Sequence, residues 1–157
     1  FGRACRDGLP YIQQAAAEMA EREIFTQEEL AAVDLSRLAD FFRSGLGMRC
    51  AEAFDGGRLH RERPFNLLQE LEGETIVVQG VIDCFFEEEG RLVLLDYKTN
   101  WIDLSKPFEQ EAERLRGSYG KQIEIYRQAL TAAAGLPVGE AYLYLFDIGR
   151  EIKMQED

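Results

Sequence analysis

The fold is decided by one stretch of the chain, GVIDCFFEEEGRLVLLDYKT, at Gly80–Thr99. Its two apolar runs, on either side of a charged turn at Glu87–Gly90, predict a pair of antiparallel strands. Asp83 interrupts the first run, and Asp96 and Lys98 end the second. Because side chains two residues apart on a strand project from the same face, Asp96 and Lys98 are expected to share a face.

The register between these two strands decides how close the aspartates lie. Counting back from the turn pairs Phe86 with Arg91 and places Asp83 opposite Leu94. A bulge, or a slip of one or two residues, would instead place Asp83 opposite Asp96. The pattern leaves both registers open, and in each of them the two aspartates are near neighbours across the ladder.

Two carboxylates held together in apolar surroundings repel each other and lose hydration. A divalent cation offsets both costs, and Mg²⁺ favours one or two carboxylates together with water and phosphate oxygens. An adjacent ammonium, such as that of Lys98, can orient a water and stabilise charge that develops on a phosphate. The alternative for an isolated Asp-x-Lys is a surface ion pair worth about 0–1 kcal/mol.

The sequence around this hairpin predicts an α/β fold with a mixed sheet. Strands are expected at residues 63–71, 74–86, 91–99, 140–148 and 150–154, with a long helix within residues 106–134. The segment before residue 58 predicts helices at 9–25, 28–33, 35–45 and 48–54, with Thr26 and Asp34 as N-caps. We therefore expect one domain over residues 1–157, with a helical part at 1–57 and a sheet and active-site core at 58–157.

Composition restricts the classes of function. The 157 residues include 18 basic and 29 acidic side chains, so the net charge is −11. A freestanding nucleic-acid-binding protein usually carries a basic face, so this charge favours a module whose DNA is held by another domain. Cys5, Cys50 and Cys84 are scattered and predict reduced thiols in a cytoplasmic protein. No apolar run approaches the roughly 20 residues of a membrane span, so we expect no membrane contact.

The long helix adds two polar groups to the candidate site. Gln122 and Tyr126 are four residues apart and share one face of the helix. Gln can contact a bound water or a phosphate, and Tyr can donate a hydrogen bond to a phosphate oxygen. The alternative is that they are a surface residue and a core aromatic residue.

The ordered set resembles a known family. Gly80 and Asp83, then DYKT at 96–99, then QIEIY at 122–126, match the pattern of RecB-type nucleases of the PD-(D/E)XK superfamily. The likeness extends to FTQEELAAVDLSRLADFFRSGLGMRCAEA, RERPF and AYLYLFDIGREI, which resemble the C-terminal nuclease region of AddA-family helicase–nuclease subunits. The resemblance therefore covers nearly the whole chain.

The resemblance implies a restriction-endonuclease-like core, with a mixed central sheet flanked by helices, that hydrolyses DNA with Mg²⁺, for which Mn²⁺ can substitute. Its metal ligands would be Asp83, Asp96 and the backbone carbonyl of Tyr97, and its catalytic groups Asp83, Asp96, Lys98, Gln122 and Tyr126. The family also has an upstream His ligand. His60 is not in that context, so we expect this ligand to fall before Phe1 and the chain, which starts without Met, to be a weakly active fragment.

The resemblance also implies partners. These are single-stranded DNA delivered by a helicase motor, the remainder of the same helicase chain and an AddB-like subunit, acting in double-strand-break repair. Trp101, Arg116 and Lys121 are the candidate DNA-binding residues, with Trp101 either stacking on a base or packing in the fold. Two alternatives differ in class. One is a nuclease-fold domain that guides DNA or binds a partner without cutting it. The other is a RecB-type exonuclease with an iron–sulfur cluster, for which three scattered cysteines do not supply four ligands.

Overall fold

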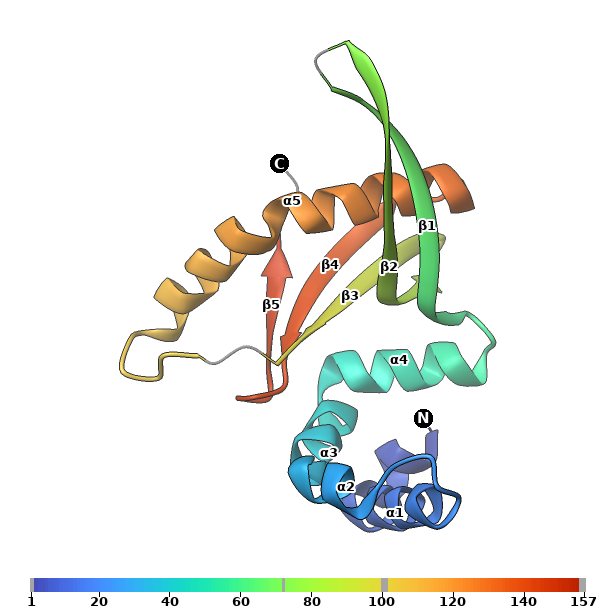
Figure 1. Ribbon diagram of the computed structural model, residues 1–157, viewed down its shortest axis with the longest axis vertical. Coiled ribbons are helices and arrows are strands. Elements are labelled where there is room, and N and C mark those ends of the chain that lie inside the picture. The colour runs from blue at the N-terminus through green and yellow to red at the C-terminus, as the bar shows by residue number, and fades with distance from the viewer. Residues whose placement is uncertain (1, 72, 100–101, 156–157) are drawn as a thin grey trace. The chain divides into compact units, whose positions relative to one another are not determined.

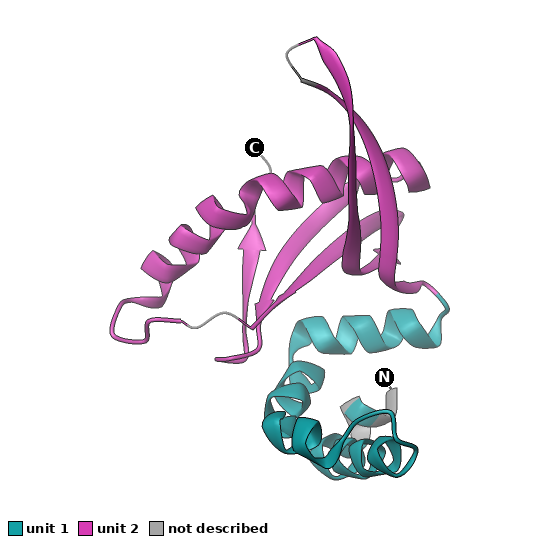
Figure 2. Ribbon diagram, in the orientation of Figure 1, with its two compact units in different colours: residues 1–57 teal, residues 58–157 magenta. Residues whose placement is uncertain are grey.

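The computed structural model describes residues 2–71, 73–99 and 102–155. The chain divides into two compact units, Phe1–Gly57 and Arg58–Asp157, which Figure 2 shows in teal and magenta. Each unit has buried apolar residues of its own. None of the helices in the described ranges is long and apolar enough to cross a membrane.

The first unit is helical, as expected. Its helices are α1 (Gly2–Glu21), α2 (Gln27–Ala32), α3 (Leu35–Arg43) and α4 (Gly45–Asp55). Thr26 and Glu29 form a capping box, in which the Thr26 side chain accepts a hydrogen bond from the N–H of Glu29 and the Glu29 carboxylate accepts one from the N–H of Thr26. Asp34 is the N-cap of α3. Helix α1 begins earlier than the pattern predicts, because a short helical stretch precedes a kink at Gly8, where φ is 62°, and the predicted helix follows the kink.

The second unit is a five-stranded mixed sheet with one long helix. Its elements are β1 (Leu59–Leu71), β2 (Glu74–Glu88), β3 (Arg91–Lys98), α5 (Phe108–Ala134), β4 (Val138–Leu145) and β5 (Arg150–Met154). The strand order is β1-β2-β3-β4-β5, and only the β3–β4 pair is parallel. Because parallel neighbours need a crossover, α5 runs between them along one face of the sheet (Figure 1). This confirms the predicted α/β class and the predicted antiparallel pair β2 and β3, beside which β1 adds a third antiparallel strand.

The core of this unit lies between α5 and the sheet. Leu92 and Leu94 of β3 and Leu143 of β4 pack against a stripe on α5 that includes Leu115 and Ile123. The stripe recurs every three or four residues, which is the spacing of one helix face. Buried leucine, isoleucine and valine side chains of this kind each contribute about 1.5–3 kcal/mol. The helix is therefore held against the sheet by packing along most of its length.

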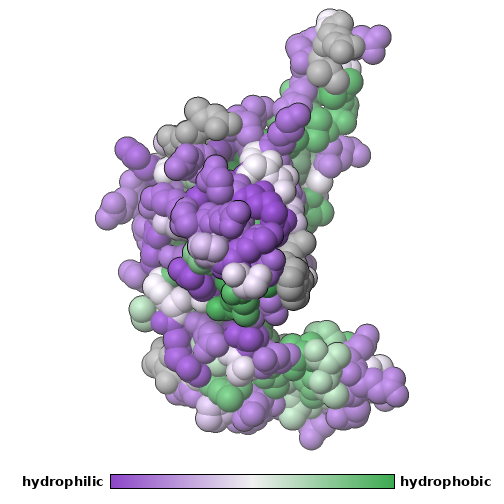
Figure 3. Space-filling model, turned by 90° about the vertical axis from the view of Figure 1, so that its left-hand side faces the viewer, coloured by the Kyte–Doolittle hydropathy of each residue, from purple (hydrophilic) through white to green (hydrophobic). Residues whose placement is uncertain are grey.

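The β1–β2 hairpin projects beyond the sheet, since β2 pairs with β3 only from Cys84 to Glu88. Its exposed apolar side chains include Leu68, Val77 and Val81. Figure 3 shows apolar surface along this hairpin. The hairpin face that bears Phe65 turns toward α5 instead, where the ring of Phe65 meets that of Tyr126 with centroids 5.5 Å apart.

Candidate active site

The end of β3 places two charged groups beside α5. Leu92 and Leu94 belong to the core against α5, and Asp96 and Lys98 continue the same alternation. Asp96 is only 2% exposed, although it is a carboxylate. The apolar part of the strand therefore fixes the direction of both charged side chains, as the sequence predicted.

The register of the hairpin corrects the prediction from counting. Glu88 pairs with Arg91 and Phe86 with Val93, so Phe86 does not pair with Arg91 and Asp83 does not face Leu94. The turn consists of two residues, Glu89 and Gly90, with φ angles of 51° and 73°. Positive φ at both central residues is typical of the tight turn that joins twisted strands. Because the turn has two residues and not four, each residue of β2 pairs two positions further along β3 than counting predicts.

This register brings Asp83 to the end of β3. The last pair of the ladder is Cys84 with Leu95, and one step further along lie Asp83 and Asp96. There a side chain takes the place of the backbone hydrogen bond between the strands. The Oδ2 of Asp83 accepts a hydrogen bond of 2.9 Å from the backbone N–H of Tyr97. In a strand the N–H and C=O of one residue point to the same edge, so the carbonyl of Tyr97 is directed to the side of Asp83.

Asp96 is the most constrained group of the site. Its Oδ2 lies 2.5 Å from the Nζ of Lys98, yet among the described residues no group meets that oxygen with hydrogen-bond geometry. Burial raises the pKa of Asp96 above the ordinary value for aspartate, the Lys98 ammonium opposes this rise, and the charge of Asp83 adds to it. The carboxylate is therefore held in a place that disfavours its own charge.

Helix α5 contributes the neutral side of the site. The Nζ of Lys98 donates a hydrogen bond of 3.2 Å to the Oε1 of Gln122, whose Nε2 donates one of 2.8 Å to the hydroxyl of Tyr126. The same Nζ lies 4.0 Å from the centre of the Tyr119 ring. Gln122 and Tyr126 are thus linked to Lys98 in one chain of contacts, with the face of Tyr119 beside it.

The regular alternation of side chains between the two faces of the sheet is interrupted in β2 at Asp83. Phe85 and Ile82 both pack against the α5 core, although strict alternation would put them on opposite faces. The described ladder pairs Arg61 with Cys84 and Arg63 with Ile82, and it skips the position between them. There Glu62 has a φ of 49°, a left-handed conformation that costs a non-glycine residue about 1–2 kcal/mol.

Gly80, part of the motif, has a steric role. A Cβ at Gly80 would lie 2.8 Å from the Cε1 of Phe65, its partner on β1. The absence of a side chain lets the Phe65 ring lie over the strand and reach Tyr126. Sequence analysis missed Phe65 and Tyr119. The signal for Tyr119 was its place three residues before Gln122 on the same helix face.

The donor set fits a divalent cation in part. No group of three His, Cys, Asp or Glu side chains within residues 2–71, 73–99 and 102–155 is arranged to hold a metal ion. Mg²⁺ needs fewer, because one or two carboxylates with water and phosphate oxygens are a usual shell. The buried Asp96 oxygen that lacks a hydrogen bond, next to a second carboxylate, is the kind of oxygen that such an ion would satisfy.

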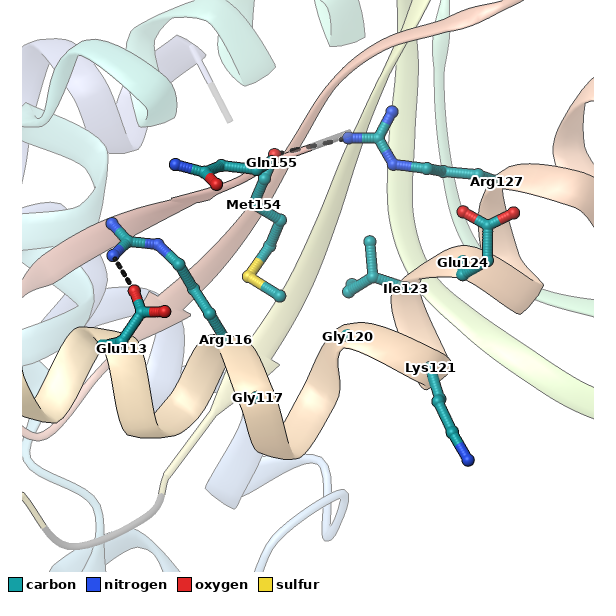
Figure 4. A pocket seen from close by; sticks show the side chains of 10 residues that line it. All are labelled: Glu113, Arg116, Gly117, Gly120, Lys121, Ile123, Glu124, Arg127, Met154 and Gln155. Carbon is teal, nitrogen blue, oxygen red and sulfur yellow. Dashed lines mark hydrogen bonds and ion pairs between the residues drawn. The ribbon is translucent and has the colours of Figure 1, made fainter. Parts of the chain in front are cut away.

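The expected DNA-binding residues lie apart from this set. Trp101 falls outside the described residues. Arg116 forms ion pairs with Glu109 and Glu113 and donates to a backbone carbonyl of β5. Arg116 and the exposed Lys121 line a cavity of about 310 Å³ between α5 and the end of β5, to which the aspartates and Lys98 do not contribute (Figure 4). A role in DNA binding stays a prediction for all three residues.

The structure also describes His60 and two of the three cysteines. His60 is not ahead of a strand but is the second residue of β1, half-buried, with its ring stacked on Phe85 at 4.8 Å. The strand begins earlier than predicted because Leu59 and His60 already pair with β2. Cys50 and Cys84 are buried, and the side chain of Cys5 lies outside the described part.

Comparison with known proteins identifies the family of the chain. The family model described as the PD-(D/E)XK nuclease superfamily matches residues 3–156. Among curated relatives, the A subunits of ATP-dependent helicase/nucleases are 40% identical in Anoxybacillus flavithermus, over 93% of this chain, and 36% identical in Clostridium perfringens, over 96%. The chain spans only 12% and 13% of the length of these relatives.

The observed fold agrees with the family match. The mixed sheet with its crossover helix is consistent with the restriction-endonuclease-like fold of this superfamily, whose nucleases generally use divalent metal ions. The match of the family model extends over both compact units of the chain. The chain belongs to the PD-(D/E)XK nuclease superfamily, and its curated relatives are AddA-type helicase/nuclease subunits.

Proposed function

We propose that the chain is the Mg²⁺-dependent nuclease module of an AddA-type helicase–nuclease and hydrolyses phosphodiester bonds in single-stranded DNA. The observation that carries this proposal is the convergence at the end of β3. The Asp83 carboxylate holds the backbone of Tyr97, Asp96 is buried beside it, and Lys98 is bonded to Gln122. A domain with only a structural or DNA-guiding role would have no need of this complete set of groups around Lys98.

Each group has a task in this reaction. Asp83, Asp96 and the carbonyl of Tyr97 would hold the cation, which supplies Lewis-acid stabilisation of the phosphate and a more acidic water. Lys98 orients the attacking water and offsets negative charge on the phosphate oxygens. Gln122 keeps Lys98 at this position, and Tyr126 fixes the amide of Gln122 by accepting its N–H.

The relatives suggest the setting of the module. Their name combines an ATP-dependent helicase with a nuclease, and this chain matches only about an eighth of their length. We propose that the helicase part of the same polypeptide and an AddB-like subunit deliver single-stranded DNA to the site, in double-strand-break repair and recombination in the cytoplasm. Such delivery is consistent with the net charge of −11, because a tethered module needs little DNA affinity of its own.

The test is cleavage of labelled single-stranded DNA with Mg²⁺ or Mn²⁺, by the chain and by a polypeptide extended at its N-terminus to include an upstream His. We expect weak cleavage by the chain and clear cleavage by the longer polypeptide. Asp96→Ala and Lys98→Ala should each lower the rate by roughly 10²–10³-fold, the usual effect of removing one group that stabilises a transition state.

Lys153→Ala is the matched control, because this lysine also forms an ion pair, with Glu140 at 2.7 Å, but on the edge strand β5. It should cut as fast as the parent. If the Asp96 and Lys98 variants also cut at the parental rate, the site assignment is wrong. If the folded longer polypeptide does not cut with either cation, the structural or DNA-guiding role replaces the nuclease.

A further inference from the structure

Three protein groups surround the ammonium of Lys98. They are the carboxylate of Asp96, the amide oxygen of Gln122 at 3.2 Å and the face of the Tyr119 ring, whose centre is 4.0 Å from Nζ. The Lys98 side chain is only 12% exposed, so water reaches little of it. An ammonium has three N–H donors, of which Gln122 accepts one, while Asp96 provides an opposite charge and Tyr119 a π face.

Of these three groups, Asp96 is also the proposed ligand of the cation. A cation and an ammonium that share one carboxylate oxygen compete for it, because each seeks the same negative charge. Lys98 therefore needs anchors other than Asp96 if it is to stay in place when the cation is bound. Gln122 and Tyr119 are such anchors, and both are uncharged, so they hold the ammonium without repelling a phosphate.

Tyr119 is well placed for this task. It lies three residues before Gln122 and seven before Tyr126, on the face of α5 that packs against the sheet. Its ring is half-buried and packs against the same core as Leu115 and Ile123, so its orientation is restricted. The negative face of an aromatic ring attracts a cation most strongly where water is scarce.

We propose that Tyr119 is a positioning residue for Lys98, and that the face of its ring, not its hydroxyl, holds the ammonium at the site. The proposal rests on the proposed nuclease function. Substitutions of Tyr119 can separate the electrostatic effect of the ring from its packing. Phe keeps the π face, whereas Leu and Met fill much of the space without one, so Tyr119→Phe should behave as the parent and Tyr119→Leu or Tyr119→Met should not.

The first readout is NMR of the chain without metal, which does not depend on catalysis. The chain has four lysines, so the ε-methylene signal of Lys98 can be assigned by its loss in Lys98→Arg. We expect this signal to be shifted upfield by the Tyr119 ring in the parent and in Tyr119→Phe. In Tyr119→Leu it should move to the position of the exposed Lys121 signal. An unchanged Lys98 signal in the folded Leu or Met variant overturns the proposal.

The second readout is a split of kcat from KM in single-stranded DNA cleavage by the longer polypeptide. Tyr119→Leu, or Tyr119→Met if the Leu variant does not fold, should lower kcat by roughly 10–100-fold, the usual effect of removing a supporting contact. KM should stay near the parental value, and Tyr119→Phe should restore kcat. If Lys98→Ala is inactive while Tyr119→Leu keeps the parental kcat, the positioning role is wrong. If Lys98→Ala itself cuts normally, the proposed function fails, and the NMR result still decides the contact.

Discussion

Asp96 is the residue at which stability and function conflict. It is a carboxylate with 2% exposure, and its Oδ2 has the charge of Lys98 nearby but no hydrogen bond within the described structure. A buried polar atom without a hydrogen bond costs about 1–3 kcal/mol. The surrounding apolar strand nevertheless holds it there, which is the pattern of a group kept for a ligand and not for the fold.

Replacing Asp96 with Asn should therefore stabilise the metal-free chain. Asn removes the buried charge, and Lys98 keeps its contacts with Gln122 and Tyr119. In EDTA we expect the free energy of unfolding in urea to rise by ~0.5–2 kcal/mol, the usual size of a stabilising substitution. With Mg²⁺ at about 100 times its Kd, the parent should gain ~2.7 kcal/mol and the variant much less. A variant that is destabilised in EDTA, or stabilised by Mg²⁺ as much as the parent, would contradict this.

Single residues were also the most predictable part of the site. The strand period places Asp96 and Lys98 on one face, and the helix period does the same for Gln122 and Tyr126. These periods need no knowledge of the rest of the fold. The helix period also places Tyr119 on the face of Gln122, but its contact with Lys98 joins two elements and depends on how α5 lies against β3.

At the scale of elements, the β2–β3 hairpin shows what a local pattern leaves open. Three glutamates precede Gly90, and composition alone does not say which of them enter the turn. Glu89 adopts a φ of 51°, which is uncommon for a residue other than Gly, Asn or Asp. Glu62 also has a left-handed conformation, opposite Asp83 where the β1–β2 pairing is interrupted. Since glutamate rarely adopts this conformation, the sequence does not indicate it.

Gly80 connects the hairpin to α5, and Gly80→Ala tests this link. The new Cβ would press on the Phe65 ring, which contacts Tyr126. We expect a loss of ~1–3 kcal/mol in the free energy of unfolding, typical of overpacking, and a lower cleavage rate because Tyr126 shifts. Adding Phe65→Leu should recover stability but not the rate, since the ring contact with Tyr126 stays lost.

Gly117→Ala is the matched control for that substitution. Gly117 lies inside α5, and nothing stands within 4 Å of the position of an added Cβ. Since Gly lowers the stability of a helix interior by ~1 kcal/mol relative to Ala, the control should be more stable and cut at the parental rate. Equal loss of stability in the Gly80 and Gly117 variants would show that the contact with Phe65 is not the cause.

At the scale of the whole chain, charge decides how DNA can be bound. The net charge is −11, and several cations, among them Lys106, Arg114, Arg116 and Lys153, already form ion pairs with carboxylates. The chain as a whole was predictable in class, because periodicity alone indicates a mixed sheet after a helical segment. Which cations are engaged was not predictable, because the pairs with Glu109 and Glu113 depend on side-chain conformations along α5.

The salt dependence of DNA binding therefore separates two residues that the sequence placed together. A protein with 6–10 phosphate contacts loses about 10³–10⁵-fold in affinity between 50 and 200 mM salt. Because this chain is acidic overall, we expect its affinity to fall less than about 10-fold over the same range of salt, measured by single-turnover cleavage below saturating DNA at fixed Mg²⁺. If Lys121, which is exposed, contacts a phosphate, Lys121→Gln should reduce the slope of log affinity against log salt by about 1.

Arg116→Gln should leave the slope unchanged and lower the melting temperature, because this guanidinium ties Glu109, Glu113 and β5 to one another. The reverse result, a lower slope for Arg116→Gln at unchanged stability, would make Arg116 the DNA contact and its ion pairs exchangeable for phosphate.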